Sequence, residues 1–221
     1  MDLTEMKVSC SYNSALQIKV VAGHFATNHS HINYYLDLNT TKVRQKEAFA
    51  VARTMANEYV ANTVIDTIVC MDGMEIIGAY LAEELTAAGI MSMNAHQSIY
   101  IITPEVNRNG QLIFRDNIKP MVKNKHILLL LASATTGITI AKSLECIEYY
   151  GGEIQGISAI FSAVSEIRDH TINSIFRAKD LYDYETYPQN DCPLCKRGIK
   201  LDAMINSYGY SELTNTKPSD H

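Results

Sequence analysis

The sequence predicts an α/β protein with a mainly parallel, twisted sheet and helices on both faces. From about residue 42 to residue 161, short β-branched apolar runs alternate with longer amphipathic stretches, as in chains built from strand–helix–strand units. The longest apolar strand leads directly into a hydroxyl-rich loop and then a helical pattern. With 221 residues, 47% of them hydrophobic, the chain is long enough for one large domain or one domain with a small appendage.

The elements follow from the spacing of apolar residues along the chain. The predicted helices cover residues 42–62, 74–88 (ended by Gly89) and 139–150. The predicted strands cover residues 66–71, 98–103, 126–132 and 154–161. The polar segment 105–125 is predicted to be a long loop or hairpin, because Pro104 ends the strand before it.

Composition excludes several classes of protein. A net charge of −5 argues against a general nucleic-acid surface, which requires a basic stripe. The sequence has no apolar run long enough to cross a bilayer and no amino-terminal pattern of a secretion signal. Five cysteines, an odd number, do not indicate a disulfide framework. We therefore expect a cytoplasmic protein that acts on neither membranes nor nucleic acids.

The loop after the strand at 126–132 is the strongest functional signal. The hydroxyls of Ser133, Thr135, Thr136 and Thr139 gather there, and the backbone N–H groups of Thr136, Gly137 and Ile138 precede the helix. Free N–H groups and the positive end of a helix dipole favour an anion such as phosphate. A strand-to-helix turn capped by one threonine is the alternative, but four hydroxyls within seven residues exceed what a cap needs.

This order of strand, Thr-Thr-Gly-x-Thr loop, helix, glycine pair and strand resembles the type I phosphoribosyltransferases. Within that family, the segment Gly23-His24-Phe25, Ser30 and Tyr34-Tyr35-Leu36-Asp37 is most similar to the orotate branch. The resemblance spans roughly residues 20–165. It implies that residues 133–139 bind the 5′-phosphate of phosphoribosyl diphosphate and that Asp72 and Gly73 lie in the diphosphate loop. It also implies that Phe25 and Tyr35 flank the base, that Mg²⁺ assists and that the protein is a homodimer.

The chain departs from the family where the strand before the phosphate loop ends. The family has two acidic residues there, which meet the ribose hydroxyls, whereas this chain has Leu131-Ala132. Losing a hydrogen bond to a charged group costs about 1.5–3 kcal/mol of binding. Two such losses mean on the order of a hundredfold in affinity unless another acid takes the role, for which Glu166 and Asp169 are candidates by position alone.

Two further positions differ from the orotate enzymes. Their mobile loop presents a Lys-Glu pair, but here the pair reads Pro104-Glu105. Glu105, Arg108 and Arg115 are therefore the candidate catalytic residues of this loop. The amino-terminal segment has Asn28 in place of a lysine, and His29 and His31 either face an acidic base or, as we favour, are exposed loop histidines.

Asp72 allows two interpretations. A carboxylate repels diphosphate unless a divalent cation lies between them. The residue also suits the N-cap of the helix predicted from residue 74, with Glu75 in the first turn, and this interpretation is slightly favoured.

The carboxyl-terminal segment contains Cys192-Pro-Leu-Cys195-Lys-Arg-Gly198, which has the form of a zinc knuckle. A structural zinc ion normally has four protein ligands, so the site would need another segment or a second copy of the chain. A redox pair and a simple turn with free thiols remain alternatives. The following residues 201–205 suggest a short helix, and Tyr208 and Tyr210 an aromatic clasp.

These observations divide the chain into an amino-terminal hood (1–40), a phosphoribosyltransferase-like core (41–180) and a carboxyl-terminal extension with the cysteine pair (181–221). Two functions follow from the resemblance and its departures. The first is an orotate-type phosphoribosyltransferase that joins ribose 5-phosphate to a pyrimidine-like base. The second is a non-catalytic module that binds a nucleotide monophosphate or ribose phosphate and regulates a partner.

Overall fold

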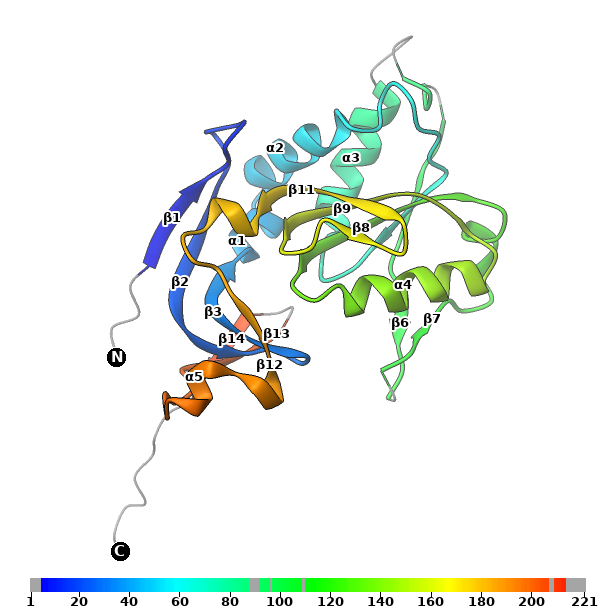
Figure 1. The fold of residues 1–221 in the computed structure, drawn as a ribbon. Helices are drawn as coiled ribbons and strands as arrows, with labels where there is room; N and C mark the ends of the chain where they lie inside the picture. Colours follow the sequence, from blue (N-terminus) through cyan, green and yellow to red (C-terminus); the bar gives the residue numbers. More distant parts are fainter. Residues whose placement is uncertain (1–4, 88–91, 96, 109, 207–208, 214–221) are drawn as a thin grey trace, which may run out of the picture.

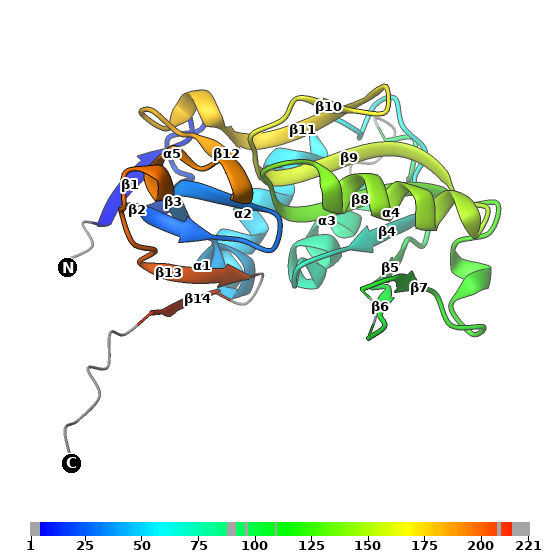
Figure 2. The same cartoon turned by 60° about the horizontal axis from the view of Figure 1, so that its bottom comes forward.

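The structure is a computed structural model, and it describes residues 5–87, 92–95, 97–108, 110–206 and 209–213. The chain builds a core sheet flanked by helices and a second sheet, the hood, beside it (Figures 1 and 2). None of the helices in these residues is both long and apolar enough to cross a membrane.

The core sheet has the strand order β10-β11-β9-β8-β4-β5. Its strands are β4 (Thr67–Cys70), β5 (Tyr100–Ile102), β8 (His126–Ala134), β9 (Glu153–Ser162), β10 (Glu166–Ile167) and β11 (His170–Arg177). All neighbours pair in parallel except β10 and β11. The predicted, mainly parallel sheet is therefore confirmed.

Helices cover both faces of this sheet. Alternate residues of β8 point to opposite faces, so Leu128 and Leu130 join one hydrophobic cluster and Leu129 and Leu131 join another. The first cluster includes residues of α2 (Gln45–Ala56) and α3 (Glu75–Ala87), and the second includes residues of α4 (Ile138–Tyr149). Gly89, predicted to end the second helix, lies outside the described residues.

The prediction of one continuous helix over residues 42–62 is wrong. The chain forms a short helix α1 (Asn39–Val43), turns at Arg44 in an extended conformation (φ −85°, ψ 121°), and continues as α2. After α2 ends, Tyr59 turns inward and its hydroxyl lies 2.8 Å from that of Ser158. The break places Thr41 and Lys42 on the buried side of α1.

The hood combines both ends of the chain. It contains β1 (Glu5–Ser9), β2 (Gln17–Ala26), β3 (Ser30–Asp37), β12 (Thr186–Pro188), β13 (Ala203–Asn206) and β14 (Gly209–Glu212). β2 and β3 are antiparallel, and β13 pairs in parallel with the end of β2. The carboxyl-terminal extension is thus part of the hood.

The short helix predicted over residues 201–205 is wrong, because Ala203–Asn206 forms strand β13 against β2. Of the predicted aromatic clasp, Tyr208 lies outside the described residues. Tyr210 packs on Tyr35, with ring centroids 5.0 Å apart.

The remaining elements are short. The segment predicted as a loop or hairpin forms the hairpin β6 (Glu105–Val106) and β7 (Leu112–Ile113), which projects from the core (Figure 1). Helix α5 (Pro193–Lys196) carries the cysteine pair. The 3₁₀ helices span Lys119–Met121, Ala178–Asp180 and Gln189–Asp191.

Candidate functional site

A pocket lies where the hood faces the carboxyl ends of β4 and β8. Ligands of open parallel sheets bind at this edge, because the loops that follow the strands converge there. The core contributes Asp72, Ala132, Ser133, Thr135, Thr139 and Phe161 to its wall. The hood side and α1 contribute Thr27, Asn28, His29, Ile32, Tyr35, Leu36, Leu38, Asn39, Lys42, Ile205, Asn206 and Gly209.

The predicted phosphate loop reaches this pocket. Ser133, Thr135 and Thr139 are three of its lining residues, whereas Thr136, Gly137 and Ile138 form the turn into α4. The N-cap position of α4 is Gly137, in a left-handed conformation (φ 75°) and without a side-chain capping bond. A turn capped by threonine is therefore not what the structure contains, and the first N–H groups of α4 lack intrahelical acceptors.

Asp72 lies directly after β4, at the pocket wall. Helix α3 begins at Glu75, so its N-cap position is residue 74, and the favoured N-cap interpretation of Asp72 is wrong. Asp72 has φ 58° and is followed by Gly73 at φ 76°, so the chain makes a tight left-handed turn. Burial raises the pKa of Asp72 above its ordinary value, against the opposing effects of Lys42 and a hydrogen bond from the backbone of Ala132.

Lys42 is a functional candidate that the sequence did not reveal. Its side chain is buried, lines the pocket and donates a hydrogen bond of 2.9 Å to the carbonyl oxygen of Asp72. Burial lowers the pKa of Lys42, while the carboxylates of Asp72, Glu75 and Asp37 oppose that shift. A lysine at the start of an amphipathic helix is normally exposed, but here Lys42 lies in the separate short helix α1, which buries it.

The two positions where the family has acids remain apolar. Leu131 is fully buried in the hydrophobic cluster beside α4, and Ala132 faces the pocket. Glu166 lies in β10 and Asp169 in the turn after it, and neither is among the residues that line the pocket. Of the described carboxylates, Asp72 alone contributes to the pocket wall.

Tyr35, which the resemblance assigns to the base, lines the hood side of the pocket. Burial, with Asp37 and Tyr210 nearby, raises the pKa of Tyr35 to about 12, so its hydroxyl stays protonated at neutral pH. Phe25 is not at the pocket surface. It is 1% exposed in the hood core and packs on Tyr35 with ring centroids 6.1 Å apart.

The candidate residues of the β6–β7 hairpin do not line this pocket. Arg115 donates two hydrogen bonds of 2.6 Å to the carboxylate of Glu105, and both side chains are largely exposed. Arg108 is exposed between the two strands. The hairpin therefore carries a paired charge on the surface that is not part of the pocket wall.

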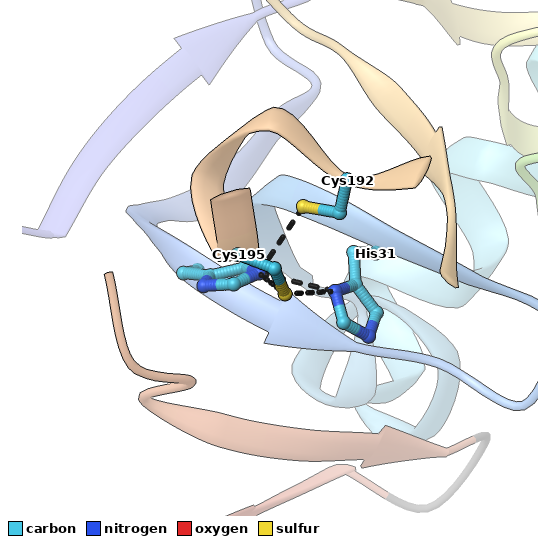
Figure 3. A group of neighbouring side chains, drawn as sticks. His31, Cys192 and Cys195 are labelled. Carbon is cyan, nitrogen blue, oxygen red and sulfur yellow. Dashed lines mark hydrogen bonds between the residues drawn. The ribbon is translucent and has the colours of Figure 1, made fainter. Parts of the chain in front are cut away.

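The cysteine pair lies against two histidines of the hood. His24 in β2, His31 in β3, Cys192 and Cys195 place one ligand atom each within 4.8 Å of the others. Figure 3 shows His31, Cys192 and Cys195 pointing toward one another. The expectation that His31 is an exposed loop histidine is wrong: it is 8% exposed, in strand β3. His29, by contrast, lies in the turn and lines the pocket.

Part of the sequence is similar to curated orotate phosphoribosyltransferases. No family model matches the sequence. The orotate phosphoribosyltransferase of Campylobacter jejuni (strain 81-176) is 27% identical over 124 residues, which cover 51% of this chain and 60% of that protein. The chain thus spans about three fifths of the length of the curated relatives it matches.

Solved structures show the same fold at low identity. The orotate phosphoribosyltransferase of Aeropyrum pernix superposes with a TM-score of 0.50 at 16% identity, over 72% of this chain and 88% of the other. A phosphoribosyltransferase of Corynebacterium diphtheriae gives 0.50 at 13%, over 72% and 90%. The Mycobacterium tuberculosis orotate enzyme in complex with 5-phospho-α-D-ribosyl 1-diphosphate gives 0.50 at 14%, over 67% and 83%. The chain therefore has the type I phosphoribosyltransferase fold and, over about half its length, resembles orotate phosphoribosyltransferases in sequence.

Proposed function

We propose that this protein is a phosphoribosyltransferase of orotate type, which transfers ribose 5-phosphate from phosphoribosyl diphosphate to a pyrimidine-like base. The observation that carries the proposal is the composition of one pocket. Hydroxyls of the loop after β8, the ammonium group of Lys42 and the carboxylate of Asp72 all line it. An anionic sugar phosphate with a second, diphosphate group matches that arrangement.

The 5′-phosphate is assigned to the end of β8, the loop that follows it and the first turn of α4. Ser133, Thr135 and Thr139 offer hydroxyl donors at the pocket wall, and the amino end of α4 adds N–H groups and its dipole. Thr136, Gly137 and Ile138 shape the turn, and the left-handed backbone of Gly137 permits it.

The diphosphate is assigned to the turn after β4. Lys42 supplies the positive charge there, and an added Cβ atom on Gly73 would lie 3.9 Å from its Nζ, so the turn and the ammonium group are neighbours. Asp72 fits a role in holding Mg²⁺, because Mg²⁺ is commonly bound by one or two carboxylates together with substrate phosphates. Bound Mg²⁺ would neutralise diphosphate charge, and without it Asp72 would repel the ligand.

The base is assigned to the hood side of the pocket. The ring of Tyr35 forms part of the wall, and Phe25 supports it from the hood core. Asn28 and His29 in the β2–β3 turn supply polar groups at the same side, suited to the hydrogen-bonding edge of a pyrimidine-like base.

The reaction requires no protein nucleophile. The bond between ribose C1 and the diphosphate oxygen breaks and a bond from C1 to the base nitrogen forms. The electron pair leaves with the diphosphate, and the proton of the base nitrogen passes to the diphosphate or to solvent. Positioning the two reactants and stabilising the leaving charge provide the rate enhancement. In this proposal Lys42 stabilises that charge, and Glu105, Arg108 and Arg115 act across the two-fold of a homodimer.

A non-catalytic phosphate-binding module is the second candidate, and one specific observation favours it. Leu131 and Ala132 replace the acidic pair, so no carboxylate from β8 can meet the ribose hydroxyls. Such a module would bind a nucleotide monophosphate or ribose phosphate and act on a partner.

Calorimetric titration distinguishes the two functions. Phosphoribosyl diphosphate, ribose 5-phosphate and orotidine monophosphate would be titrated with and without Mg²⁺. Micromolar, Mg²⁺-dependent binding of the diphosphate, followed by turnover with a base from a pyrimidine panel, would support the transferase. Binding of the monophosphates alone, indifferent to Mg²⁺, would refute it and support the module.

A further inference from the structure

Four side chains from two distant segments of the chain converge, two from the β2–β3 hairpin of the hood and two from the cysteine pair. Nε2 of His24 lies 3.4 Å from Sγ of Cys192 and 3.7 Å from Sγ of Cys195. Nδ1 of His31 lies 3.3 Å from Sγ of Cys195 and 3.1 Å from Nε2 of His24. A tetrahedral zinc site with ordinary bond lengths has ligand-to-ligand distances of about 3.3–3.8 Å, so three of these four separations match it and the fourth is slightly short.

The hydrogen bond made by the other ring nitrogen of His24 fits a metal ligand. Its Nδ1 lies 2.9 Å from the carbonyl oxygen of Ile199, which can only accept, so Nδ1 carries the proton. In the neutral imidazole with that tautomer, Nε2 presents a lone pair to the two sulfurs and to Nδ1 of His31. A histidine that donates its second ring N–H to a backbone carbonyl is the usual outer-shell arrangement of a zinc ligand.

The local backbone holds the ligands in place. The pairing of β2 and β3 shifts register between Ala22 and Phe25, and at this irregularity the ring of His24 lies beside that of His31, which is opposite Ala26. Cys192 is the N-cap of α5, Cys195 lies within that helix, and Gly198 follows with φ 74°. His24 and Cys192 are each 1% exposed, whereas Cys195 is exposed.

We propose that His24, His31, Cys192 and Cys195 bind one structural Zn²⁺ that fastens the carboxyl-terminal extension to the hood. Two thiolates and two imidazoles are ligands that zinc prefers, and four protein ligands leave no open position for catalysis. The proposal does not depend on the transferase activity, because it concerns only this cluster.

The ion would also hold the hood side of the pocket in shape. The backbone N–H of His24 donates to the carboxylate of Asp202 at 2.8 Å, and the N–H of Asp202 donates to the carbonyl of His24 at 2.8 Å. Directly after Asp202, β13 begins and leads to Ile205 and Asn206 in the pocket wall. The two histidines also flank the turn whose residues 27–29 line the pocket.

Elemental analysis of the untagged, full-length protein tests the metal directly. We expect about one zinc ion per chain, lost in Cys195→Ser and in His31→Asn. Cys146→Ser and His29→Asn are matched controls, because they remove a half-buried thiol of α4 and an imidazole of the hood turn without touching the cluster, and they should keep the full zinc content. Equal zinc content in all four variants would overturn the assignment.

Cobalt substitution keeps the test decisive if a variant fails to fold. Reduced wild-type protein, freed of metal and titrated with Co²⁺, should develop the visible bands of tetrahedral Co²⁺ and a sulfur-to-metal charge-transfer band, with saturation at one equivalent. Addition of Zn²⁺ should abolish these bands. A protein that contains no zinc as purified and shows no such bands with Co²⁺ has no site, and the cysteine pair would then be a thiol or disulfide turn.

Discussion

Replacing Lys42 by methionine tests the least expected feature of the pocket. Lys42 is 6% exposed, and its Nζ donates to the carbonyl oxygen of Asp72 at 2.9 Å. Methionine has a similar length and keeps most of the apolar packing of the stem, so the main loss is the positive charge. If the ammonium group binds the diphosphate of the substrate, affinity falls while the fold persists.

The expected size follows from the chemistry of a charged hydrogen bond. Such a bond contributes about 1.5–3 kcal/mol, and each 1.4 kcal/mol changes a dissociation constant about tenfold. Lys42→Met should therefore weaken phosphoribosyl diphosphate binding by about 10- to 150-fold. Ribose 5-phosphate, which occupies only the loop after β8 in our assignment, should bind almost as in the wild type.

Titration calorimetry at physiological ionic strength measures both ligands. Lys46→Met is the matched control, because it removes the same charge from an exposed position of α2. At that salt concentration the screening length is about 8 Å, so the loss of this exposed charge should have little effect on binding. A combined Lys42→Met and Asp72→Asn variant separates lost binding from the cost of a buried carboxylate without its cation. Unchanged affinity of a folded Lys42→Met protein for the diphosphate would refute the role of Lys42.

Three further predictions concern the phosphate loop, Asp72 and the metal. Gly137→Ala should unfold at lower denaturant concentration than Gly110→Ala and lose phosphate binding. Both glycines have φ near 75°, which costs alanine about 1–2 kcal/mol, but only at Gly137 would the new Cβ lie 2.4 Å from Ile167; equal stability would contradict this. Burial raises the pKa of Asp72, so as the pH falls this carboxylate becomes protonated at a higher pH than an ordinary aspartate does. Without Mg²⁺, diphosphate binding should therefore tighten on acidification more in the wild type than in Asp72→Asn, and parallel pH profiles would be evidence against it. Finally, a zinc chelator should speed tryptic cleavage after Lys196, as followed by mass spectrometry, whereas an unchanged cleavage rate would show that no metal holds the extension.

The core was predictable because its signals are local. The apolar run from residue 126 and the pattern from residue 139 predicted β8 and α4 to within two residues, since strand and helix periodicities are visible in a short window. Once this strand and this helix are placed, the residues at their junction are placed as well. Ser133 and Thr135 therefore lie in the pocket.

The hood was not predictable in detail because its pairings are not local. Residues 201–205 have the spacing of a helix turn, yet Ala203 pairs with Phe25, a partner that no window of sequence contains. The same applies to the cluster, in which Cys192 meets His24 across 168 positions. The sequence signal for this cluster was the spacing of His24 and His31, seven residues apart on either side of a polar turn. This spacing is what two histidines on neighbouring strands of a hairpin would have.

An enzyme and a binding module differ in whether the pocket contains a carboxylate that can hold Mg²⁺, and in this chain that carboxylate comes from an unusual position. An acidic side chain at the position of Leu131 would be unfavourable in this chain. The side chain there is fully buried beside α4, where a charge would be costly. Ala132 faces the pocket, and its backbone N–H hydrogen-bonds to the carboxylate of Asp72. The end of β8 is thus still next to a carboxylate, but one supplied by the turn after β4. Asp72 is therefore the residue through which this pocket can retain Mg²⁺-assisted chemistry, and Mg²⁺-dependent binding that disappears in Asp72→Asn is the result that a purely phosphate-binding module would not give.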